Sequence, residues 1–551
     1  MREMSASTFL DRAPIARGSA GPSRAQLTIG LVILAVAARM IGLSERPLWL
    51  DEAYSAWFAS RDWHYLWTVV PTFEPHPPVY YSILKVWGFV FGESPLALRS
   101  LSVLFGIAAV PITIAAAFER EELKPSGNPR LSAAIAGFLV ACLPMLVGLG
   151  QEARPYPLLV FAYSLSILAA LRLFRQFHGD APGEWSSWII LGIGTELTLW
   201  AHGLGILYAL CLAAALGPAW LKPTMNKARL WRGGTIAMFV SAFYLPCLIM
   251  IVGRSRDWGA NWLAWDPSML LQLVTFYSVV HITTLASLVA TILILLLAKR
   301  AVQQALQSRS WNSDAMLLIL WLGPPLLAAA VSALFLPIFL PRTLAGTIVP
   351  ASLAIAGALA RTPSPRERAL LTIAVCLTLL PSTLETALRP SFERWDLVAA
   401  YLSRNVSAGD QVWLYPSDSA LPLKAAGSRL DEMVRPLPAP FPTLGIEGPI
   451  RAGWPAMVSL SPRAAERIAS DPALGRVGRI WLVTRQSGIF DPANDLPKAL
   501  ARVREPGLAE EWGYISVQPF VRPRRPGTAE RANGGQSALT AASSQRGLRS
   551  Q

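Results

Sequence analysis

Long apolar runs occupy most of the first 390 or so residues. They extend for about 17 residues or more, and at 1.5 Å per helical residue this length crosses a hydrocarbon layer of about 30 Å. The first run, at 27–43, is not followed by a small-residue cleavage site, so we interpret it as a retained span and not as a signal peptide. Further spans are predicted at about 98–118, 131–149, 157–174, 187–201, 203–220, 233–252, 281–298, 315–336, 343–360 and 369–388. The pattern predicts a polytopic α-helical membrane protein with about eleven crossings.

The segment 44–97 separates the first two spans. Its first part, 44–78, is rich in tryptophan, proline and carboxylates. The stretch Val79–Phe91 is apolar, but it is short for a crossing and Lys85 interrupts it. It is therefore predicted to be a helix that lies against the membrane. Residues 27–388 are expected to form one transmembrane domain that carries this segment as a loop.

The chain changes character near residue 389, where charge and proline rise and the apolar runs shorten to strand length. Short apolar runs and helical stretches alternate there, which predicts a small α/β domain over 389–524. The expected strands lie at 411–415, 479–484 and 514–521, and the expected helices at 393–402 and 463–469. The polar segments 1–26 and 525–551 contain too little apolar content for a core and are predicted to be disordered.

Basic residues are distributed unequally around the predicted spans. If the N-terminus is cytoplasmic, the segments on that side hold about nineteen lysines and arginines, against about eight on the other side. An excess of lysine and arginine marks cytoplasmic loops. We therefore expect segment 44–97 and the domain 389–524 to lie outside the cytoplasm.

Composition agrees with a membrane protein. Of 551 residues, 53% are hydrophobic and only 15% are charged, whereas a typical soluble domain is about one quarter charged. The net charge of +14 lies mostly in short loops and in the tail, which argues against nucleic acid as a partner. All four cysteines fall inside apolar runs without ligand-like spacing, so we expect packing residues and not zinc ligands or disulfides.

Candidate chemistry begins with the adjacent carboxylates Asp51 and Glu52, just after the first span. Desolvation near the bilayer and mutual repulsion should raise the pKa of such a pair unless cations compensate. A carboxylate in this position suits a general base that removes a proton from a hydroxyl. The alternative is a solvated pair that caps a short helix, and residue types alone do not decide between the two.

Three further polar features lie on the same predicted face. The stretch 74–81 offers His76 and Tyr80 on a proline-stiffened backbone, although it would also serve as an aromatic anchor at the interface. The short turn 151–156 contains Glu152, Arg154 and Tyr156. Its two charged residues could instead simply form a surface ion pair. Arg342 lies at the outer end of a span and suits a phosphate, unless it only snorkels. Together these features would suit an anionic lipid head group that carries a sugar.

These four features and a fifth motif occur in one order across about 40–400. They are the Asp51-Glu52 pair, the His-Pro-Pro-Val-Tyr-Tyr stretch from His76, FGESPLALRSLSVLFG at 91–106, the Gln-Glu-Ala-Arg-Pro-Tyr turn at 151–156 and the Phe-Leu-Pro-Arg segment that ends at Arg342. As a set they resemble the bacterial protein-mannosyltransferase-like superfamily of GT-C glycosyltransferases, which includes protein O-mannosyltransferases and the lipid A aminoarabinose transferase. The stretch SFERWDLVAAYL at 391–402 resembles the segment that opens the outer domain in many bacterial members.

The resemblance implies an inverting transfer of a hexose or pentose from a polyprenyl-phosphate donor. The acceptor would be a lipid, a glycan or a protein at the outer face of the bacterial inner membrane. Asp51 would activate the acceptor and Glu152 matches the second acidic site of the family, while Arg342 and His76 would stabilise the leaving phosphate. The family commonly has tyrosine after the late arginine, and Thr343 stands there instead. No metal or cofactor motif is present, although the acidic cluster could hold a divalent cation.

Two polar residues inside or beside a span stay outside this candidate site. Glu196 lies within a predicted span and His202 near its end, where each suits either a function or a hydrogen bond to a neighbouring helix. The main alternative function is a transporter or flippase of a lipid-linked sugar. Charged motifs that gather in loops, and the absence of paired sequence halves, argue against it.

Overall fold

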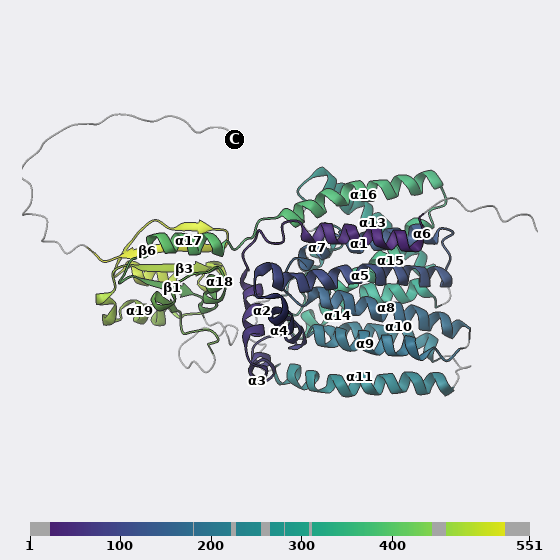
Figure 1. Ribbon diagram of the computed structural model, residues 1–551, viewed down its shortest axis with the longest axis horizontal. Helices are drawn as coiled ribbons and strands as arrows, with labels where there is room; N and C mark the ends of the chain where they lie inside the picture. The colour runs from purple at the N-terminus through teal and green to yellow at the C-terminus, as the bar shows by residue number, and fades with distance from the viewer. Residues whose placement is uncertain are drawn as a thin grey trace, which may run out of the picture.

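The computed structural model describes residues 22–179, 181–221, 227–254, 265–279, 282–307, 311–443 and 459–523. The chain forms a helical bundle with an α/β domain at one end of it (Figure 1). The segments 1–26 and 525–551, which we predicted to be disordered, lie outside the described residues apart from 22–26. There α1 (Arg24–Met40) begins, capped by Ser23, whose side chain accepts a hydrogen bond from the backbone of Gln26, so residues 24–26 belong to the helix.

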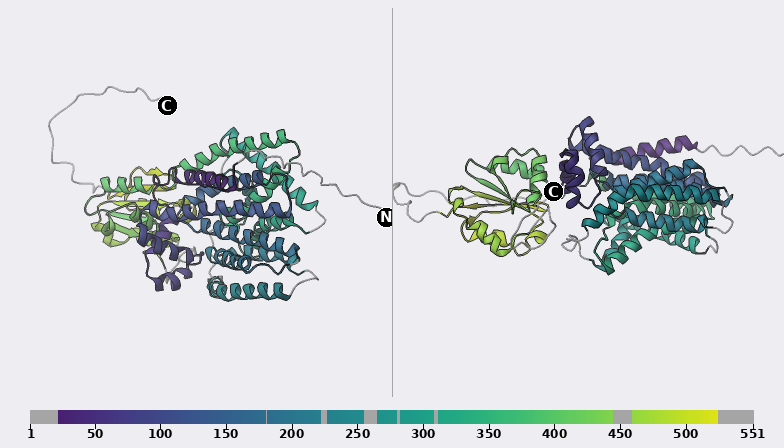
Figure 2. Two further views of the ribbon diagram at one scale, coloured as in Figure 1. Left: turned by 45° about the vertical axis from the view of Figure 1, so that its right-hand side comes forward. Right: turned by 90° about the horizontal axis from the view of Figure 1, so that it is seen from below.

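Apolar helices run side by side through the bundle (Figures 1 and 2). Besides α1 they are α5 (Pro95–Leu123), α6 (Pro129–Cys142), α7 (Pro144–Gly150), α8 (Tyr156–His178), α9 (Trp185–Ala201), α10 (Gly205–Trp220), α11 (Lys227–Arg254), α13 (Leu285–Leu306), α14 (Ser313–Leu334), α15 (Ile348–Ala360) and α16 (Pro365–Leu388). Among the described residues, seven helical spans are long and apolar enough to cross a membrane, or eight if the bent pair α6 and α7 counts as one. The helices α1, α9 and α10 have only 16 or 17 residues. Each of the eleven predicted crossings thus corresponds to a helix or to the bent pair, and the polytopic fold is confirmed.

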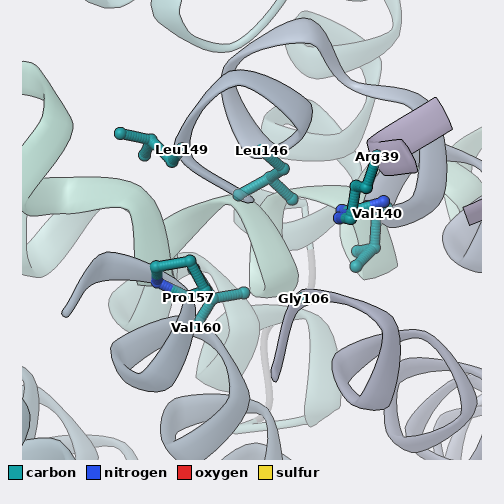
Figure 3. A pocket seen from close by; sticks show the side chains of 7 residues that line it. All are labelled: Arg39, Gly106, Val140, Leu146, Leu149, Pro157 and Val160. Atoms are coloured by element: carbon teal, nitrogen blue, oxygen red, sulfur yellow. The ribbon is translucent and has the colours of Figure 1, made fainter. Parts of the chain in front are cut away.

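The bend between α6 and α7 measures 50°. Pro144 opens α7, and the residue before a proline is disfavoured in the helical conformation. Arg39 of α1 donates to the carbonyl oxygens of Ala141 at 2.8 Å and Val140 at 3.0 Å near the break. Gly106 leaves the space that Arg39 needs, because a Cβ there would lie 2.7 Å from Nε (Figure 3). A buried arginine therefore holds the broken span in place.

The segment between α1 and α5 forms three short helices at the end of the bundle (Figure 1). They are α2 (Leu50–Ser60), α3 (Trp63–Thr68) and α4 (Val79–Phe91), with the 3-10 turn η1 (Val70–Thr72) before α4. One side of α4 is buried through Tyr80, Tyr81 and Leu84, while Phe89 is 91% exposed. At 13 residues α4 is too short for a crossing, as the sequence predicts.

The C-terminal part is a sheet with helices on both faces (Figure 2). Its strands are β1 (Gln411–Tyr415), β2 (Val434–Pro436), β3 (Ile480–Arg485), β4 (Glu505–Pro506), β5 (Glu510–Trp512) and β6 (Ile515–Val521), in the order β2-β1-β3-β6-β4 with β5 also paired to β6. The strands β2, β1 and β3 are parallel, and β6 is antiparallel to β3. Its helices include α17 (Trp395–Asn405), α18 (Ala420–Ala425), α19 (Pro462–Ala469) and α21 (Asp495–Ala501), with the 3-10 turn η5 (Ser417–Ser419) before α18. The three predicted strands and two predicted helices agree with observed ones within about three residues.

Candidate functional site

The adjacent carboxylates lie in the first turn of α2, which begins at Leu50. A helix N-terminus stabilises negative charge there because its backbone N–H groups point toward it. The carboxylate of Glu52 also accepts a hydrogen bond from the N–H of Trp49, so the capping interpretation is correct for Glu52. Side chains of successive helical residues point about 100° apart, and the two carboxylates accordingly have different partners.

Glu52 is fully buried and is bound from two directions. Arg99 of α5 contacts both its oxygens, with Nε to Oε1 at 2.7 Å and Nη2 to Oε2 at 2.6 Å, and the N–H of Ala153 donates to Oε1 at 2.9 Å. The same guanidinium donates to the carbonyl oxygens of Leu43 and Arg46, both at 2.8 Å. Glu52 therefore ties three segments together and has no carboxylate oxygen left for a substrate proton.

Asp51 faces two arginines that come from distant parts of the chain. Its Oδ2 lies 3.4 Å from Nη2 of Arg342 and 3.9 Å from Nη2 of Arg154. Arg342 belongs to the 3-10 turn η4 (Pro341–Thr347) and Arg154 to the turn between α7 and α8. The Asp51 side chain keeps 20% of its surface exposed, so the structure leaves this carboxylate accessible.

Glu152 lies at the start of the turn after α7 and forms a group of three carboxylates with Asp51 and Glu52. Burial, together with the nearby charges of Glu52 and Asp51, raises its pKa to about 7 against the opposing charges of Arg342 and Arg154. Glu152 thus holds a proton into the neutral range. The sequence predicted such a raised pKa for the Asp51-Glu52 pair on the same physical grounds.

The proton on Glu152 makes a testable contribution to stability. An unfolded glutamate ionises near pH 4.5, whereas folded Glu152 ionises near pH 7. Between these values the folded state binds more protons, so its stability should fall as the pH rises from about 4.5 to 7 and stay level above. Glu152→Gln cannot ionise. We expect its melting temperature, measured in detergent, to gain on that of the wild type over this interval, and parallel curves would contradict the assignment.

His76 lies beside this group and has a carboxylate partner of its own. Its Nδ1 is bound to the carboxylate of Glu74, which also accepts a hydrogen bond from the Tyr81 hydroxyl at 2.9 Å. Burial lowers the pKa of His76 below its usual value although Glu74 opposes this shift. For Glu74, burial raises the pKa, but the contacts with His76 and Tyr81 and the charge of Arg154 together outweigh burial, and the pKa falls to about 2. His76 therefore offers a neutral imidazole and not a fixed cation.

His202, which the sequence analysis left out of the site, packs directly against His76. The ring centroids are 4.7 Å apart, and the ring of Tyr156 lies 5.9 Å from His202 and 6.0 Å from His76. His202 follows α9 at its end, so the break between α9 and α10 brings it there. The only signal for His202 in the sequence was its position, as a polar residue near the end of a predicted span.

The guanidinium groups of Arg342 and Arg154 also lie near aromatic rings. The guanidinium carbon of Arg342 is 5.9 Å from the rings of both Tyr156 and Trp49, and that of Arg154 is 6.0 Å from Tyr156. Within the described parts of the chain, Nε of Arg342 and Nε of Arg154 are buried without a hydrogen-bond partner. Two cations with spare donors at one place suit an anionic ligand.

Three other residues that the sequence analysis named, of which only Tyr80 was a predicted site residue, have different surroundings. The hydroxyl of Tyr80 is buried in helix packing, 3.0 Å from Oγ of Ser102. Thr343, where the family has tyrosine, donates its hydroxyl to the carbonyl of Leu340 within its own turn at 2.7 Å. Both carboxylate oxygens of Glu196 in α9 lack a hydrogen-bond partner among the described residues. In the part of the chain that the structure describes, no three His, Cys, Asp or Glu side chains gather as a metal site would require.

This architecture, an apolar helical bundle with a carboxylate-bearing first loop and a C-terminal α/β domain, is the GT-C fold of membrane glycosyltransferases. ArnT from Cupriavidus metallidurans in the apo state superposes with a TM-score of 0.54 at 14% identity over 89% of this chain and 97% of that one. The same protein bound to undecaprenyl phosphate gives a TM-score of 0.51 at 13% identity, with the same coverage.

An oligosaccharyltransferase from Archaeoglobus fulgidus, tethered to an acceptor peptide, gives a TM-score of 0.50 at 14% identity over 91% of this chain and 74% of that one. No protein-family model matches the sequence, and no curated protein matches it significantly. At these identities the structures establish the fold, and the predicted GT-C architecture is confirmed.

Proposed function

We propose that this protein is a membrane glycosyltransferase that transfers a sugar from a polyprenyl-phosphate donor to a lipid, glycan or protein acceptor at the outer face of the bacterial inner membrane. The observation that carries the proposal is the group around Asp51. An accessible carboxylate lies 3.4 Å and 3.9 Å from two arginines with unused donors, in a protein with the GT-C fold.

The chemistry assigns one task to each kind of group. Asp51 accepts the proton of an acceptor hydroxyl, whose oxygen attacks the anomeric carbon of the donor sugar while the bond from that carbon to the phosphate oxygen breaks. Attack from the opposite side inverts the anomeric centre. Arg342 and Arg154 stabilise the charge that develops on the departing polyprenyl phosphate. A neutral His76 and the Tyr156 ring line the sugar side of the site.

Turnover by the purified protein tests the proposal directly. The protein is incubated with a panel of polyprenyl-phosphate hexoses and pentoses and with lipid, glycan and peptide acceptors, and products are identified by mass spectrometry. Transfer of a sugar, mannose or another, with release of polyprenyl phosphate supports the proposal. Movement of the lipid-linked sugar across a vesicle membrane without transfer would favour the transporter alternative.

Arg342→Lys separates charge from geometry at the phosphate. Lysine keeps the positive charge but loses the planar fork that binds two phosphate oxygens. We expect a weaker donor affinity together with a slower rate, and a loss smaller than that for Asp51→Asn. The control is Arg394→Lys, because Arg394 pairs with Asp396 on the surface of the C-terminal domain. Equal kinetics of Arg342→Lys and wild type would remove Arg342 from the phosphate site.

The orientation of the protein is a separate prediction. The charge distribution predicts that segment 44–97 and the C-terminal domain lie outside the cytoplasm. Alkaline phosphatase fused at about residue 70 or about residue 430 should be active, and a cytoplasmic reporter at the same positions should be inactive. The opposite result at either position would place the site on the cytoplasmic side.

A further inference from the structure

The C-terminal domain contacts the N-terminus of α2, the helix that carries Asp51. The backbone N–H of Leu50 donates to Oε2 of Glu393 at 2.9 Å, and the same oxygen accepts the indole N–H of Trp395 at 2.9 Å. Glu393 is 3% exposed. A carboxylate that accepts from the first turn of a helix stabilises that end, so Glu393 caps α2 from a domain more than 300 residues away in sequence.

The same domain makes a second contact with α2, one helical turn further along. The hydroxyl of Tyr54 donates to Oδ2 of Asp418 at 2.6 Å. Asp418 belongs to η5 and has no exposed surface. Arg485, at the end of β3, joins the two contacts because Nη1 lies 3.4 Å from Oε1 of Glu393 and Nη2 lies 3.6 Å from Oδ2 of Asp418. Glu393, Asp418 and Arg485 are hereafter called the α2 clamp.

The two gripped residues flank the accessible carboxylate. Leu50 precedes Asp51, and Tyr54 follows it by three positions, which places Tyr54 about one turn further along the helix. A rotation or shift of α2 would change the 3.4 Å and 3.9 Å separations between Asp51 and the two arginines. The arginines belong to the bundle, whereas the α2 clamp belongs to the C-terminal domain. The separations between Asp51 and the two arginines therefore depend on how the C-terminal domain contacts α2.

We propose that the α2 clamp positions Asp51 for proton transfer, so that the C-terminal domain is part of the catalytic unit although none of its residues need touch the substrate. This inference rests on the proposed function, in which Asp51 is the base. A displacement of about 1 Å in a catalytic group can cost about 10²-fold in rate, so loss of one clamp contact should reduce kcat more than donor affinity.

Tyr54→Phe tests the clamp with the smallest change. It removes the hydroxyl that Asp418 binds, while the ring keeps its contacts with Phe58 and Phe441, with centroids at 5.8 Å and 5.0 Å. We expect kcat to fall about tenfold or more, within the range that misplacement causes, with the donor KM changed by no more than about twofold. Hydrogen–deuterium exchange of the α2 amides should rise in parallel, and this readout does not depend on activity.

Glu393 supplies the conservative rescue. Glu393→Gln keeps an oxygen that accepts the Leu50 N–H and should retain most of kcat, whereas Glu393→Ala should lose it. In a double-mutant cycle of Tyr54→Phe with Asp418→Ala, the double variant should be no slower than the slower single variant, because both substitutions remove the same hydrogen bond between Tyr54 and Asp418.

Tyr401→Phe is the matched control, since the ring of Tyr401 contacts the rings of Trp481 and Trp512 inside the C-terminal domain. Normal kcat and normal exchange in Tyr54→Phe, or an equal loss in Tyr401→Phe, would overturn the clamp. Failure of the proposed function would look different. In that case the wild type would not transfer sugar or Asp51→Asn would remain active, and the exchange measurement would still decide whether the clamp holds α2.

Discussion

Asp51→Asn is expected to lower sugar turnover by about 10²–10⁴-fold, the range typical for loss of a general base. Asparagine has the size and hydrogen-bonding capacity of aspartate but lacks the basic lone pair that accepts the proton of the acceptor. Arg154 also donates to the backbone oxygen of Asp51 at 3.1 Å, so one arginine stays attached to this turn in the variant. Donor binding should therefore remain near that of the wild type. Steady-state rates and equilibrium donor binding, measured on the same preparation, separate the two effects.

The matched control is Asp396→Asn, which makes the same chemical change on a half-exposed surface pair with Arg394. It should leave turnover unchanged. An Asp51→Asn protein that folds, inserts and still transfers sugar at the wild-type rate would contradict the role of Asp51 as base. Glu152 would then be the next candidate, because its pKa of about 7 suits proton exchange near neutral pH.

Arg99→Met is expected to destabilise the protein by about 3–5 kcal/mol, the usual cost of leaving one partner of a buried ion pair alone. Both side chains of the pair are almost completely buried, and Glu52 would lose both of its contacts to the guanidinium. The variant also removes the hydrogen bonds to the carbonyl oxygens of Leu43 and Arg46. Thermal unfolding in detergent, with binding of donor as the check for a native site, measures the loss.

The double variant Glu52→Gln/Arg99→Met provides the control. Removing both charges leaves no buried unpaired ion, so the double variant should be more stable than the sum of the two single losses predicts. If the free energy of unfolding of Arg99→Met is within about 1 kcal/mol of that of the wild type, the Arg99–Glu52 pair contributes no more than a weak surface ion pair. That result would contradict its assigned role in holding the loop.

The carboxylate pair illustrates how far residue types could lead. The sequence left open whether Asp51 and Glu52 form a reactive pair or a helix cap, and the structure gives the two residues different partners. Glu52 caps α2 and pairs with Arg99, whereas Asp51 faces Arg342 and Arg154. Adjacent residues in a helix point in different directions, so their partners depend on which elements pack on each side.

The histidines and the α2 clamp show where sequence reasoning ended. His202 was set aside because a polar residue at a span end suits a hydrogen bond to a neighbouring helix as well as it suits a function. Its proximity to His76 follows from how the ends of α9 and the loop before α4 pack. Asp418 had no distinguishing pattern at all, since a single aspartate after a strand is common in any α/β domain.

The sequence by itself determined the membrane class, the order of the spans, the short helix α4 and the strands β1, β3 and β6 of the C-terminal sheet. These features depend on local hydropathy and side-chain alternation, which act over about 5 to 20 residues. Only the tertiary structure decided which carboxylate meets which arginine and that the C-terminal domain grips α2. Those contacts join residues up to 364 positions apart, and such pairings arise from the packing of whole elements, which no local pattern encodes.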